Sequence, residues 1–365
     1  MTIFVDEQIP LLANSLRDVA TVYTFLGREL NRNQLIQNNC EILFVRSTTK
    51  VDNDLLDGTM VKFVGTATSG TDHIDVNYLQ SKNIHFVDAK GSNANSVAEY
   101  VIFSILHWAI KNRIVLKNLP VGIIGFGNIG SLVAKYCHYL GMRVFINDPP
   151  LLEKLSSEEK NCLPNYVNYL QINELIYHCK IVTNHVPLTK MGKYPTWNLL
   201  NKENLFLLNE NTLFIHTSRG GVVVEKDLLE VKKSKNLTLV VDVWENEPNI
   251  NTELVCECEI CTPHIAGYSV EGKLRGTLKM LVEFEKFTNL KPNYAEVMAE
   301  LNKYKPMEMK SFSSPQDIYN QLLNNRKILE DTLRFKKIVD LTDIEDRKKY
   351  FDYPRKHYPQ RRETL

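Results

Sequence analysis

The sequence carries almost no net charge. Its 365 residues include 44 Lys and Arg against 43 Asp and Glu, which leaves a formal net charge of +1 at pH 7. Without an excess of positive charge, a protein has little long-range attraction for nucleic acid or for an anionic membrane surface. The composition therefore favours a small molecule as the partner.

Long hydrophobic runs are missing as well. The amino-terminal segment MTIFVDEQIP carries acidic residues where a secretion signal needs basic ones, and no later run approaches the roughly 18 apolar residues of a membrane-spanning helix. The seven cysteines are an odd number spread over a long chain, which argues for reduced thiols and against a secreted disulfide framework. We expect a cytoplasmic protein that binds neither nucleic acid nor membrane.

Short runs of β-branched and aromatic residues alternate with stretches of helical pattern. The first series contains MTIFV, EILFVRS, VKFVGTA and IHFVDA, and the second contains VGII, MRVFIND, KIVTNHVPL, TLFIHTS, LTLVVDVW and EICTPHI. Alternating strands and helices are typical of doubly wound parallel sheets. The sequence predicts two Rossmann-like α/β domains, connected by a helix that starts near Asn95, where Ser96 and Glu99 have the spacing of a capping box.

The amino-acid composition of the chain changes near its carboxyl end. After about Lys291 it becomes polar and rich in Lys and Tyr, and it has no strand run as strong as the earlier ones. A chain of 365 residues is long enough for two or three domains. We expect residues 291–365 to form a smaller α+β domain used for self-association.

A glycine motif marks a candidate cofactor site. Gly125, Gly127 and Gly130 form G-x-G-x-x-G directly after the strand run VGII and directly before the helical stretch SLVAKYCHYLG. This context is typical of a dinucleotide site, in which the glycines permit a tight turn, close approach of a pyrophosphate and packing of helix on strand. Asp148 lies 18 residues beyond Gly130, at the end of the next strand run, where a carboxylate accepts hydrogen bonds from a ribose diol. NAD is therefore favoured over NADP.

Three candidate catalytic residues follow strand runs of the second series. Arg219 ends TLFIHTSRGG, Glu247 lies in VVDVWENEP after Asp242, and His264 follows in CTPHIAG. Arginine binds a carboxylate with both arms of its guanidinium, and histidine exchanges protons near neutral pH. A carboxylate beside the imidazole would hold its tautomer and stabilise its protonated form. Each residue alone has an ordinary structural explanation, but their order after a dinucleotide motif favours catalysis.

A zinc site is the competing interpretation of the segment that contains His264. Cys256, Cys258, Cys261 and His264 together resemble a ligand set of three cysteines and one histidine. The spacing C-x-C-x-x-C-x-x-H lacks the separated pairs of a structural zinc site, and the segment also reads as a buried strand. We expect no metal.

The stretches GFGNIG, HVPLT, TSRGG, DVWENEP and PHIAG resemble the D-2-hydroxyacid dehydrogenases over roughly residues 40–290. The resemblance implies that Arg219, Glu247 and His264 are the catalytic residues. It also implies a substrate-binding domain of residues 1–95 with 265–290 and an NAD-binding domain of residues 96–264. Further NAD contacts are implied at Asp148, Val186, Thr217, Ser218, Arg219, Asp242 and Gly267.

Further stretches resemble one subgroup of this family. These are FVRSTTKV, KFVGTATSGTDHID, YPTWNLL, VWENEPNIN, HIAGYSVEGKLRGT and the final YFDYPRKHYPQRRE. The resemblance implies oxidation of 4-phospho-D-erythronate to 2-oxo-3-hydroxy-4-phosphobutanoate on the way to pyridoxal phosphate, by a homodimer held partly through its carboxyl-terminal domain. It implies substrate contacts from Ser47, Thr68 and Tyr268. Val186 departs from the subgroup, which usually has threonine there, so one side-chain hydrogen bond to the cofactor is absent.

Two questions are left: which residues bind the substrate phosphate, and which other functions the sequence allows. A phosphate requires cationic groups or backbone donors, and among Arg46, Lys50, Lys273 and Arg275 we favour Arg46, next to Ser47. One alternative is another D-2-hydroxyacid dehydrogenase, of the phosphoglycerate or glyoxylate/hydroxypyruvate type. A second is a non-catalytic, NAD-sensing corepressor, and the intact catalytic trio favours an enzyme over it.

Overall fold

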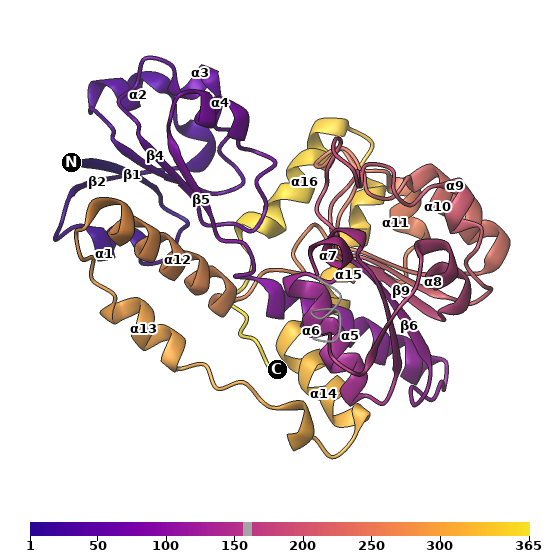
Figure 1. Cartoon of the computed structure of the whole chain (residues 1–365). Coiled ribbons are helices and arrows are strands. Elements are labelled where there is room, and N and C mark those ends of the chain that lie inside the picture. Colours follow the sequence, from indigo (N-terminus) through magenta and orange to yellow (C-terminus); the bar gives the residue numbers. More distant parts are fainter. Residues whose placement is uncertain (156–162) are drawn as a thin grey trace. The chain divides into compact units, whose positions relative to one another are not determined.

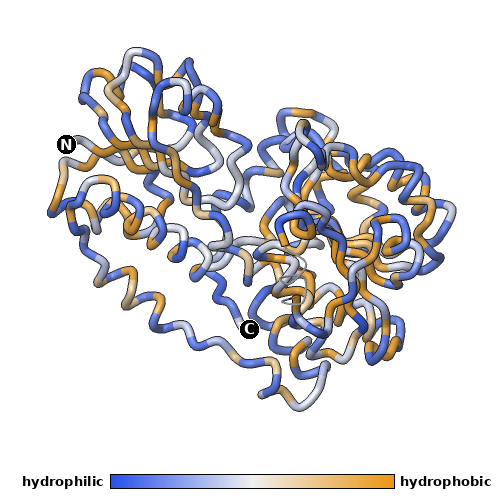
Figure 2. The backbone as a smooth tube through the Cα atoms, viewed as in Figure 1, coloured by the Kyte–Doolittle hydropathy of each residue, from blue (hydrophilic) through white to orange (hydrophobic). Residues whose placement is uncertain are grey.

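The computed structural model describes residues 1–155 and 163–365, which divide into two units, each built on a parallel sheet (Figure 1). Unit 1 consists of residues 1–93 and 269–305, and unit 2 of residues 94–268 and 306–365. Figure 2 shows hydrophobic residues concentrated along the strands within each unit. The two parallel sheets with flanking helices confirm the predicted fold class.

Unit 1 has a five-stranded parallel sheet with the strand order β2-β1-β3-β4-β5. Its strands are β1 (Thr2–Asp6), β2 (Thr21–Phe25), β3 (Ile42–Val45), β4 (Phe63–Thr66) and β5 (His85–Asp88). Its helices are α1 (Leu12–Leu16), α2 (Arg32–Gln37), α3 (Asn53–Leu56), α4 (Val76–Ser81), α12 (Val270–Thr288) and α13 (Ala295–Asn302).

Alternating side chains of these strands supply the two cores of unit 1. Ile3 and Val5 of β1 belong to the cluster that covers one face, whereas Phe4 belongs to the cluster on the other. The period of two along a strand produces this division. Helix α12 contributes Leu281 and Phe284 to the first cluster, which explains why a segment so late in the chain returns to unit 1.

Unit 2 has a seven-stranded parallel sheet with the order β12-β11-β10-β9-β6-β7-β8. Its strands are β6 (Pro120–Ile124), β7 (Arg143–Asn147), β8 (Val167–Tyr169), β9 (Ile181–Asn184), β10 (Leu213–His216), β11 (Thr238–Val241) and β12 (Ile260–Cys261). Its first helices are α5 (Ala94–Lys111), α6 (Asn128–Tyr139), α7 (Pro149–Lys154), α8 (Ile172–His178), α9 (Lys202–Leu205), α10 (Glu225–Lys235) and α11 (Thr252–Glu257).

Helix α5 begins where the sequence predicts, but without the expected capping box. The helix starts at Ala94, so Ser96 and Glu99 lie inside its first turns. Both side chains are fully buried, and they bond to Ala266 and to the amide of Leu365. The capping interpretation was wrong because these polar groups serve distant parts of the chain.

The carboxyl-terminal region differs from the expected separate α+β domain. Residues 291–365 are all described and contain helices but no strand, and they are divided between the units at residue 305. Those of unit 2, yellow in Figure 1, form α14 (Pro315–Arg326), α15 (Ile328–Lys336) and α16 (Ile344–Lys356) with the 3-10 segments Met309–Ser311 and Lys337–Asp340.

These helices join the cores of unit 2. Ile318 and Leu322 of α14 pack into the cluster that contains α5, and Phe335 and Phe351 pack into the cluster on the other face of the sheet. Apolar residues spaced at helical intervals bury one stripe of each helix, which favours helices over strands. Among the described residues, no helix is both long and apolar enough to span a membrane.

Candidate active site

The glycine motif lies at the carboxyl end of β6, where α6 begins. Gly125 has a φ of +89°, which glycine adopts without steric cost. A Cβ atom at Gly130 would lie 2.0 Å from the carbonyl oxygen of Gly125, so only glycine lets the helix pack this close. A Cβ at Gly127, the N-cap of α6, would meet nothing within 4 Å. The start of α6 thus offers backbone donors to an approaching anion, as a dinucleotide pyrophosphate requires.

Asp148 follows β7, the strand next to β6. One carboxylate oxygen accepts from the amide of Phe126 at 2.8 Å, and the other accepts from the amide of Leu151 at 2.9 Å and so caps α7. The side chain therefore holds the glycine loop in place. A carboxylate has about four acceptor positions, so acceptor capacity remains for ribose hydroxyls.

The next candidate cofactor residues follow β9 and β10. Val186 lies against the glycine turn, with its Cγ1 2.9 Å from the position of a Cβ at Gly125. Thr217 Oγ1 is 3.5 Å from Nδ1 of His185, and the Ser218 hydroxyl donates to the side-chain oxygen of Asn184. Both hydroxyls thus bond to the adjacent strand segment.

Two neutral histidines lie beneath this edge of the sheet. Burial lowers the pKa of His185 and of His216 to about 3. Both rings are therefore uncharged at neutral pH, and they hydrogen-bond within the sheet to Thr183 and Asn184. Because both rings are buried and already bonded within the sheet, we assign proton transfer to neither of them.

His264 and Glu247 form a hydrogen-bonded pair. The Nδ1 atom of His264 is 2.8 Å from Oε2 of Glu247, whose Oε1 accepts from the amide of Trp244 at 3.0 Å. Although burial opposes it, the charge and hydrogen bond of His264, with the charge of Arg355, lower the pKa of Glu247. An ionised carboxylate only accepts hydrogen bonds, so it holds the proton on Nδ1. The imidazole is 31% exposed, which leaves Nε2 for exchange with a substrate.

Asp242 holds the segment that carries His264. Its Oδ1 accepts from the amide of Ile265 at 2.8 Å and from the hydroxyl of Thr262 at 2.6 Å, and its Oδ2 accepts from the amide of Ala266 at 3.0 Å. Burial raises the pKa of Asp242, against the opposing charge of His264 and these hydrogen bonds. The carboxylate thus fixes the backbone directly after His264.

Arg219 lies at the same edge of the sheet. It follows β10, Glu247 follows β11, and His264 follows β12, and these three strands are neighbours. Its guanidinium donates to the carbonyl of Ser218 at 2.7 Å. Open α/β sheets place their ligands at the carboxyl ends of strands.

The expected substrate residues of unit 1 follow β3 and β4. Ser47 is exposed, and Thr68 is half-buried with its hydroxyl 2.8 Å from that of Thr66. Arg46 donates to the side chain of Gln8 at 2.6 Å. Each lies at the carboxyl edge of the unit 1 sheet.

The four candidate phosphate ligands differ in their burial and in their bonding partners. Lys50 is exposed and pairs with Asp52 at 2.5 Å, and Arg275 donates to the carbonyl of Ser92 at 2.8 Å. Burial, followed by the positive charge of Arg46, lowers the pKa of Lys273 to about 8. The positive charge of Arg46 thus acts on Lys273, and an anion bound to both would relieve their repulsion.

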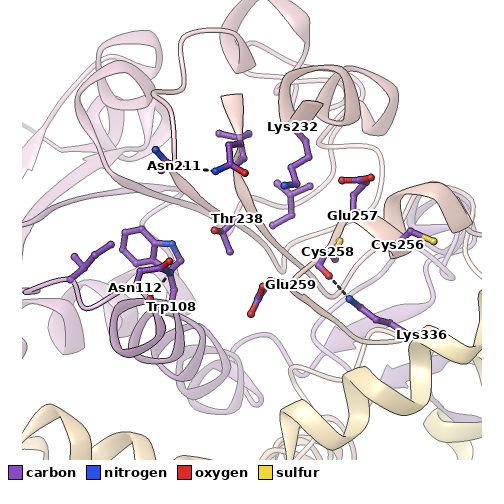
Figure 3. Close-up of a pocket in the computed structure, with 14 residues that line it drawn as sticks. Trp108, Asn112, Asn211, Lys232, Thr238, Cys256, Glu257, Cys258, Glu259 and Lys336 are labelled. Atoms are coloured by element: carbon purple, nitrogen blue, oxygen red, sulfur yellow. Dashed lines mark hydrogen bonds between the residues drawn. The ribbon is translucent and has the colours of Figure 1, made fainter. Parts of the chain in front are cut away.

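Figure 3 shows a surface pocket at the other end of the unit 2 strands. Its volume is about 760 Å³, and its lining includes Asn211, Thr238 and Glu259, at the amino-terminal ends of β10, β11 and β12. Neither the glycine motif nor the His264–Glu247 pair lines it. The candidate active site is therefore at the opposite, carboxyl edge.

The three cysteines of the candidate zinc site differ in burial. Cys256 is exposed, whereas Cys258 and Cys261 are buried, and burial raises the pKa of the Cys261 thiol to about 12. In residues 1–155 and 163–365, no three His, Cys, Asp or Glu side chains are grouped as metal ligands. The six described cysteines are free, and Cys162 lies outside the described residues.

Comparisons with known proteins identify the family. A sequence profile for the D-isomer specific 2-hydroxyacid dehydrogenase, NAD binding domain, matches residues 107–266. The chain is 38% identical over 374 residues to an erythronate-4-phosphate dehydrogenase of Shewanella halifaxensis, which covers 100% of this chain and 93% of that protein. For the erythronate-4-phosphate dehydrogenase of Wigglesworthia glossinidia brevipalpis the identity is 36% over 340 residues, 92% of this chain and 87% of that protein. The chain belongs to the erythronate-4-phosphate dehydrogenase family.

Solved structures show the same architecture for this family member. A D-lactate dehydrogenase from Aquifex aeolicus in complex with NAD and lactic acid superposes with a TM-score of 0.65 at 25% identity, covering 79% of this chain and 96% of that one. A 3-phosphoglycerate dehydrogenase of Entamoeba histolytica with NAD⁺ has a TM-score of 0.65 at 23% identity, covering 79% and 96%. The family, the NAD-binding domain and NAD as cofactor are thereby confirmed.

Two arginines near the catalytic segment were missed by sequence reasoning. Arg355 of α16 donates a hydrogen bond to Tyr268, whose ring also lies edge-on to Tyr358 with 5.5 Å between centroids. Arg326 of α14 bonds to the carbonyl of Ala266. The stretch YFDYPRKHYPQRRE contains Arg355 and resembles the subgroup, but a charged tail gives no sign of which residues fold back onto a site.

Proposed function

We propose that this protein is an NAD-dependent oxidoreductase that oxidises 4-phospho-D-erythronate to 2-oxo-3-hydroxy-4-phosphobutanoate, a step toward pyridoxal phosphate. The observation that carries the proposal is the His264–Glu247 pair at 2.8 Å, at the edge of the sheet that bears the glycine motif and Asp148. The printed names of the relatives support this substrate.

Three side chains have separate roles in the proposed reaction. His264 Nε2 accepts the proton of the 2-hydroxyl group, while Glu247 stabilises the imidazolium that forms. Arg219 binds the substrate carboxylate with its guanidinium and polarises the developing carbonyl. NAD, when bound, accepts the hydride from carbon 2.

The cofactor is held by the residues at the carboxyl edge of unit 2. The amides that follow Gly125 and Gly127 at the start of α6 bind the pyrophosphate, and Asp148 binds the adenosine ribose. We assign further contacts to Val186, through its backbone, and to Thr217, Ser218, Asp242 and Gly267, as the family resemblance implies. Unit 2 is thus the NAD-binding domain.

Unit 1 carries most of the substrate contacts that we propose besides those of the catalytic residues. We assign Ser47, Thr68 and, from unit 2, Tyr268 to the substrate, and Arg46 with Lys273 to its phosphate. The lowered pKa of Lys273 supports this assignment, because a phosphate beside two cations offsets their mutual repulsion. Arg46→Ala should raise the KM for the phosphorylated substrate about tenfold or more. Lys50→Ala, which removes an exposed lysine paired with Asp52, is the matched control.

We propose a cytoplasmic homodimer. Leu333, Ile344 and Tyr353 of α15 and α16 are large apolar residues with exposures of 69, 51 and 65%. A contiguous patch of exposed apolar side chains marks a protein contact, and the proposal requires these three to form one. Sedimentation of the wild type and of Leu333→Asp tests this, since a dimer formed through these helices would dissociate in the variant.

The decisive experiment follows NADH absorbance with purified protein, NAD and one acid at a time. The acids are 4-phospho-D-erythronate, 3-phosphoglycerate and glycerate, each with and without a 2-keto acid, and consumption of each acid is measured in parallel. Consumption of phosphoerythronate alone supports the proposal, and dependence on the keto acid means that the cofactor is retained between turnovers. Turnover of another acid would keep the dehydrogenase activity but assign it a different substrate. Bound NAD without turnover of any acid would favour the alternative of a non-catalytic, NAD-sensing corepressor.

A further inference from the structure

The segment after His264 is held from two sides. Asp242 accepts hydrogen bonds from the amides of Ile265 and Ala266, as described above. On the other side, the carbonyl oxygen of Ala266 accepts from the guanidinium of Arg326 at 2.8 Å and from the hydroxyl of Ser96 at 2.9 Å. Ser96 in turn accepts from the second arm of Arg326 at 2.7 Å. Both polar groups of Ala266 are thereby fixed.

Arg326 is deeply buried for an arginine. Its side chain is 1% exposed, and the carboxylate that faces it, Glu99, is 0% exposed with Oε2 3.7 Å from the guanidinium. That separation is long for an ion pair, and Glu99 directs its other oxygen to the amides of Thr364 and Leu365. Buried ion pairs contribute little to stability compared with apolar side chains of similar size. The arginine is therefore better explained by what its guanidinium holds.

The end of the chain supports Arg326 in turn. The guanidinium of Arg361 donates to the main-chain carbonyl of Arg326 and to Asp331, the latter at 2.9 Å from its second arm. The side-chain amide of Asn95 donates to the carbonyl of Leu365 at 2.7 Å. Arg361, Thr364 and Leu365 are all buried. The tail thus covers the Arg326–Glu99 pair and closes it from solvent.

We propose that Arg326 is a positioning residue for catalysis, which holds the His264 segment against Glu247 by fixing the carbonyl of Ala266 opposite Asp242. This inference rests on the proposed function of His264. His264 has a φ of +56°, a left-handed conformation that is unfavourable for residues other than glycine, so its backbone needs restraint from its surroundings. The carboxyl-terminal helices are then part of the catalytic apparatus in addition to any role in self-association.

The test compares two variants of this network, Arg326→Lys and Ser96→Ala, with a matched control elsewhere in unit 2. Arg326→Lys keeps a positive charge near Glu99 but loses the planar fork, and Ser96→Ala removes the second donor to Ala266 while Arg326 stays. The control is Lys336→Met. Lys336 of α15 also donates to a main-chain carbonyl of unit 2, that of Cys258 at 2.6 Å, but at the opposite end of the strands (Figure 3).

Three quantities are measured for each variant: kcat with KM, the melting temperature, and the downfield NMR signal of the imidazole proton shared by His264 and Glu247. Arg326→Lys should lower kcat about tenfold to a hundredfold, as misplacement of a catalytic group does. Its NMR signal should broaden or shift, and KM for NAD should change less than kcat. Ser96→Ala should show the same pattern more weakly. Lys336→Met should keep the wild-type kcat and NMR signal, even where its melting temperature falls.

The outcomes separate the two proposals. A wild-type protein without dehydrogenase activity refutes the proposed function, and the NMR signal still reports whether Arg326 positions the pair. Wild-type activity together with an unchanged kcat and an unchanged signal in Arg326→Lys overturns the positioning role. Equal losses of kcat in Arg326→Lys and Lys336→Met would also overturn it, because the effect would then follow stability alone.

Discussion

Each unit is built on its own parallel sheet, but the two differ in the connection that follows their first strand. In unit 2, β6 leads through the glycine motif into α6, a helix of 12 residues. In unit 1, β1 leads into a loop without glycine, in which the amide of Gln8 donates to the side chain of Asp6 at the end of β1 at 2.9 Å, and α1 has only five residues. The connection in unit 1 thus uses a backbone amide to bond its own side chain, whereas the connection in unit 2 has the glycines and the start of a long helix. The difference teaches that the loop residues, and not the sheet, determine which unit binds a dinucleotide.

The largest expected effect comes from removing the proposed proton carrier of unit 2, His264. His264→Asn keeps a polar side chain beside Glu247 but cannot exchange the proton, so kcat should fall about 10³-fold. NAD affinity, measured by isothermal titration calorimetry, should stay within about threefold of the wild type. His85→Asn, at an exposed position on β5 of unit 1, is the control and should keep its kcat. Comparable loss in both variants would contradict the assignment of catalysis to unit 2.

Two glycine variants test whether the loop itself makes the difference between units. Gly130→Ala places a methyl group 2.0 Å from the carbonyl of Gly125, so both the melting temperature and NAD affinity should fall, the latter about tenfold or more. Gly127→Ala meets nothing within 4 Å, so only NAD affinity should fall. Calorimetry and thermal unfolding measure both quantities. Wild-type affinity in Gly127→Ala would show that the pyrophosphate does not approach this backbone.

Asp148 tests cofactor choice at the same loop. Asp148→Ser keeps an oxygen that can cap α7 but removes the charge that we propose binds the ribose hydroxyls and repels a 2′-phosphate. We expect the preference for NAD over NADP, measured as the ratio of kcat/KM values, to fall about tenfold. The melting temperature is the control for capping. A preference that does not change would move the ribose contact to another residue.

The smallest expected effect concerns pH and stability. Burial raises the pKa of Glu225 to about 8, from an ordinary value of 4.5. The unfolded chain therefore releases this proton at lower pH than the folded protein, and the free energy of unfolding falls as pH rises between these two values. The slope is of order 1 kcal/mol per pH unit. Glu225→Gln should remove this slope in urea unfolding at pH 5 to 8, and an unaltered slope would assign it to another group.

Local pattern was enough for much of the fold. The alternation of strand and helix runs, the glycine motif and the acid after the next strand are all short-range signals, because periodicity and turn chemistry act over a few residues. They predicted two parallel sheets, the position of α5 and the edge that carries Arg219, Glu247 and His264. Packing could not be inferred in the same way for the polar tail, because residues 291–365 form helices that are divided between the two units and not a separate α+β domain.

Ser96 and Glu99 show where local reasoning stops. Their spacing fits a capping box, yet their side chains bond to Ala266 and to the amide of Leu365, 170 and 266 positions further along the chain. A short-range pattern and a long-range contact use the same residue types, and only the folded backbone distinguishes them.

The sequence by itself determined the fold class, the family, the cofactor and the candidate catalytic residues, since each depends on residues that are close in the chain or on motifs of fixed spacing. Tertiary structure decided how those residues are held. The pairing of His264 with Glu247, the bonds of Asp242 and Arg326 to the amide and the carbonyl of Ala266, and the burial of Arg361 all join segments that are distant in sequence. Such contacts form only when packing brings the segments together, and that depends on the whole core.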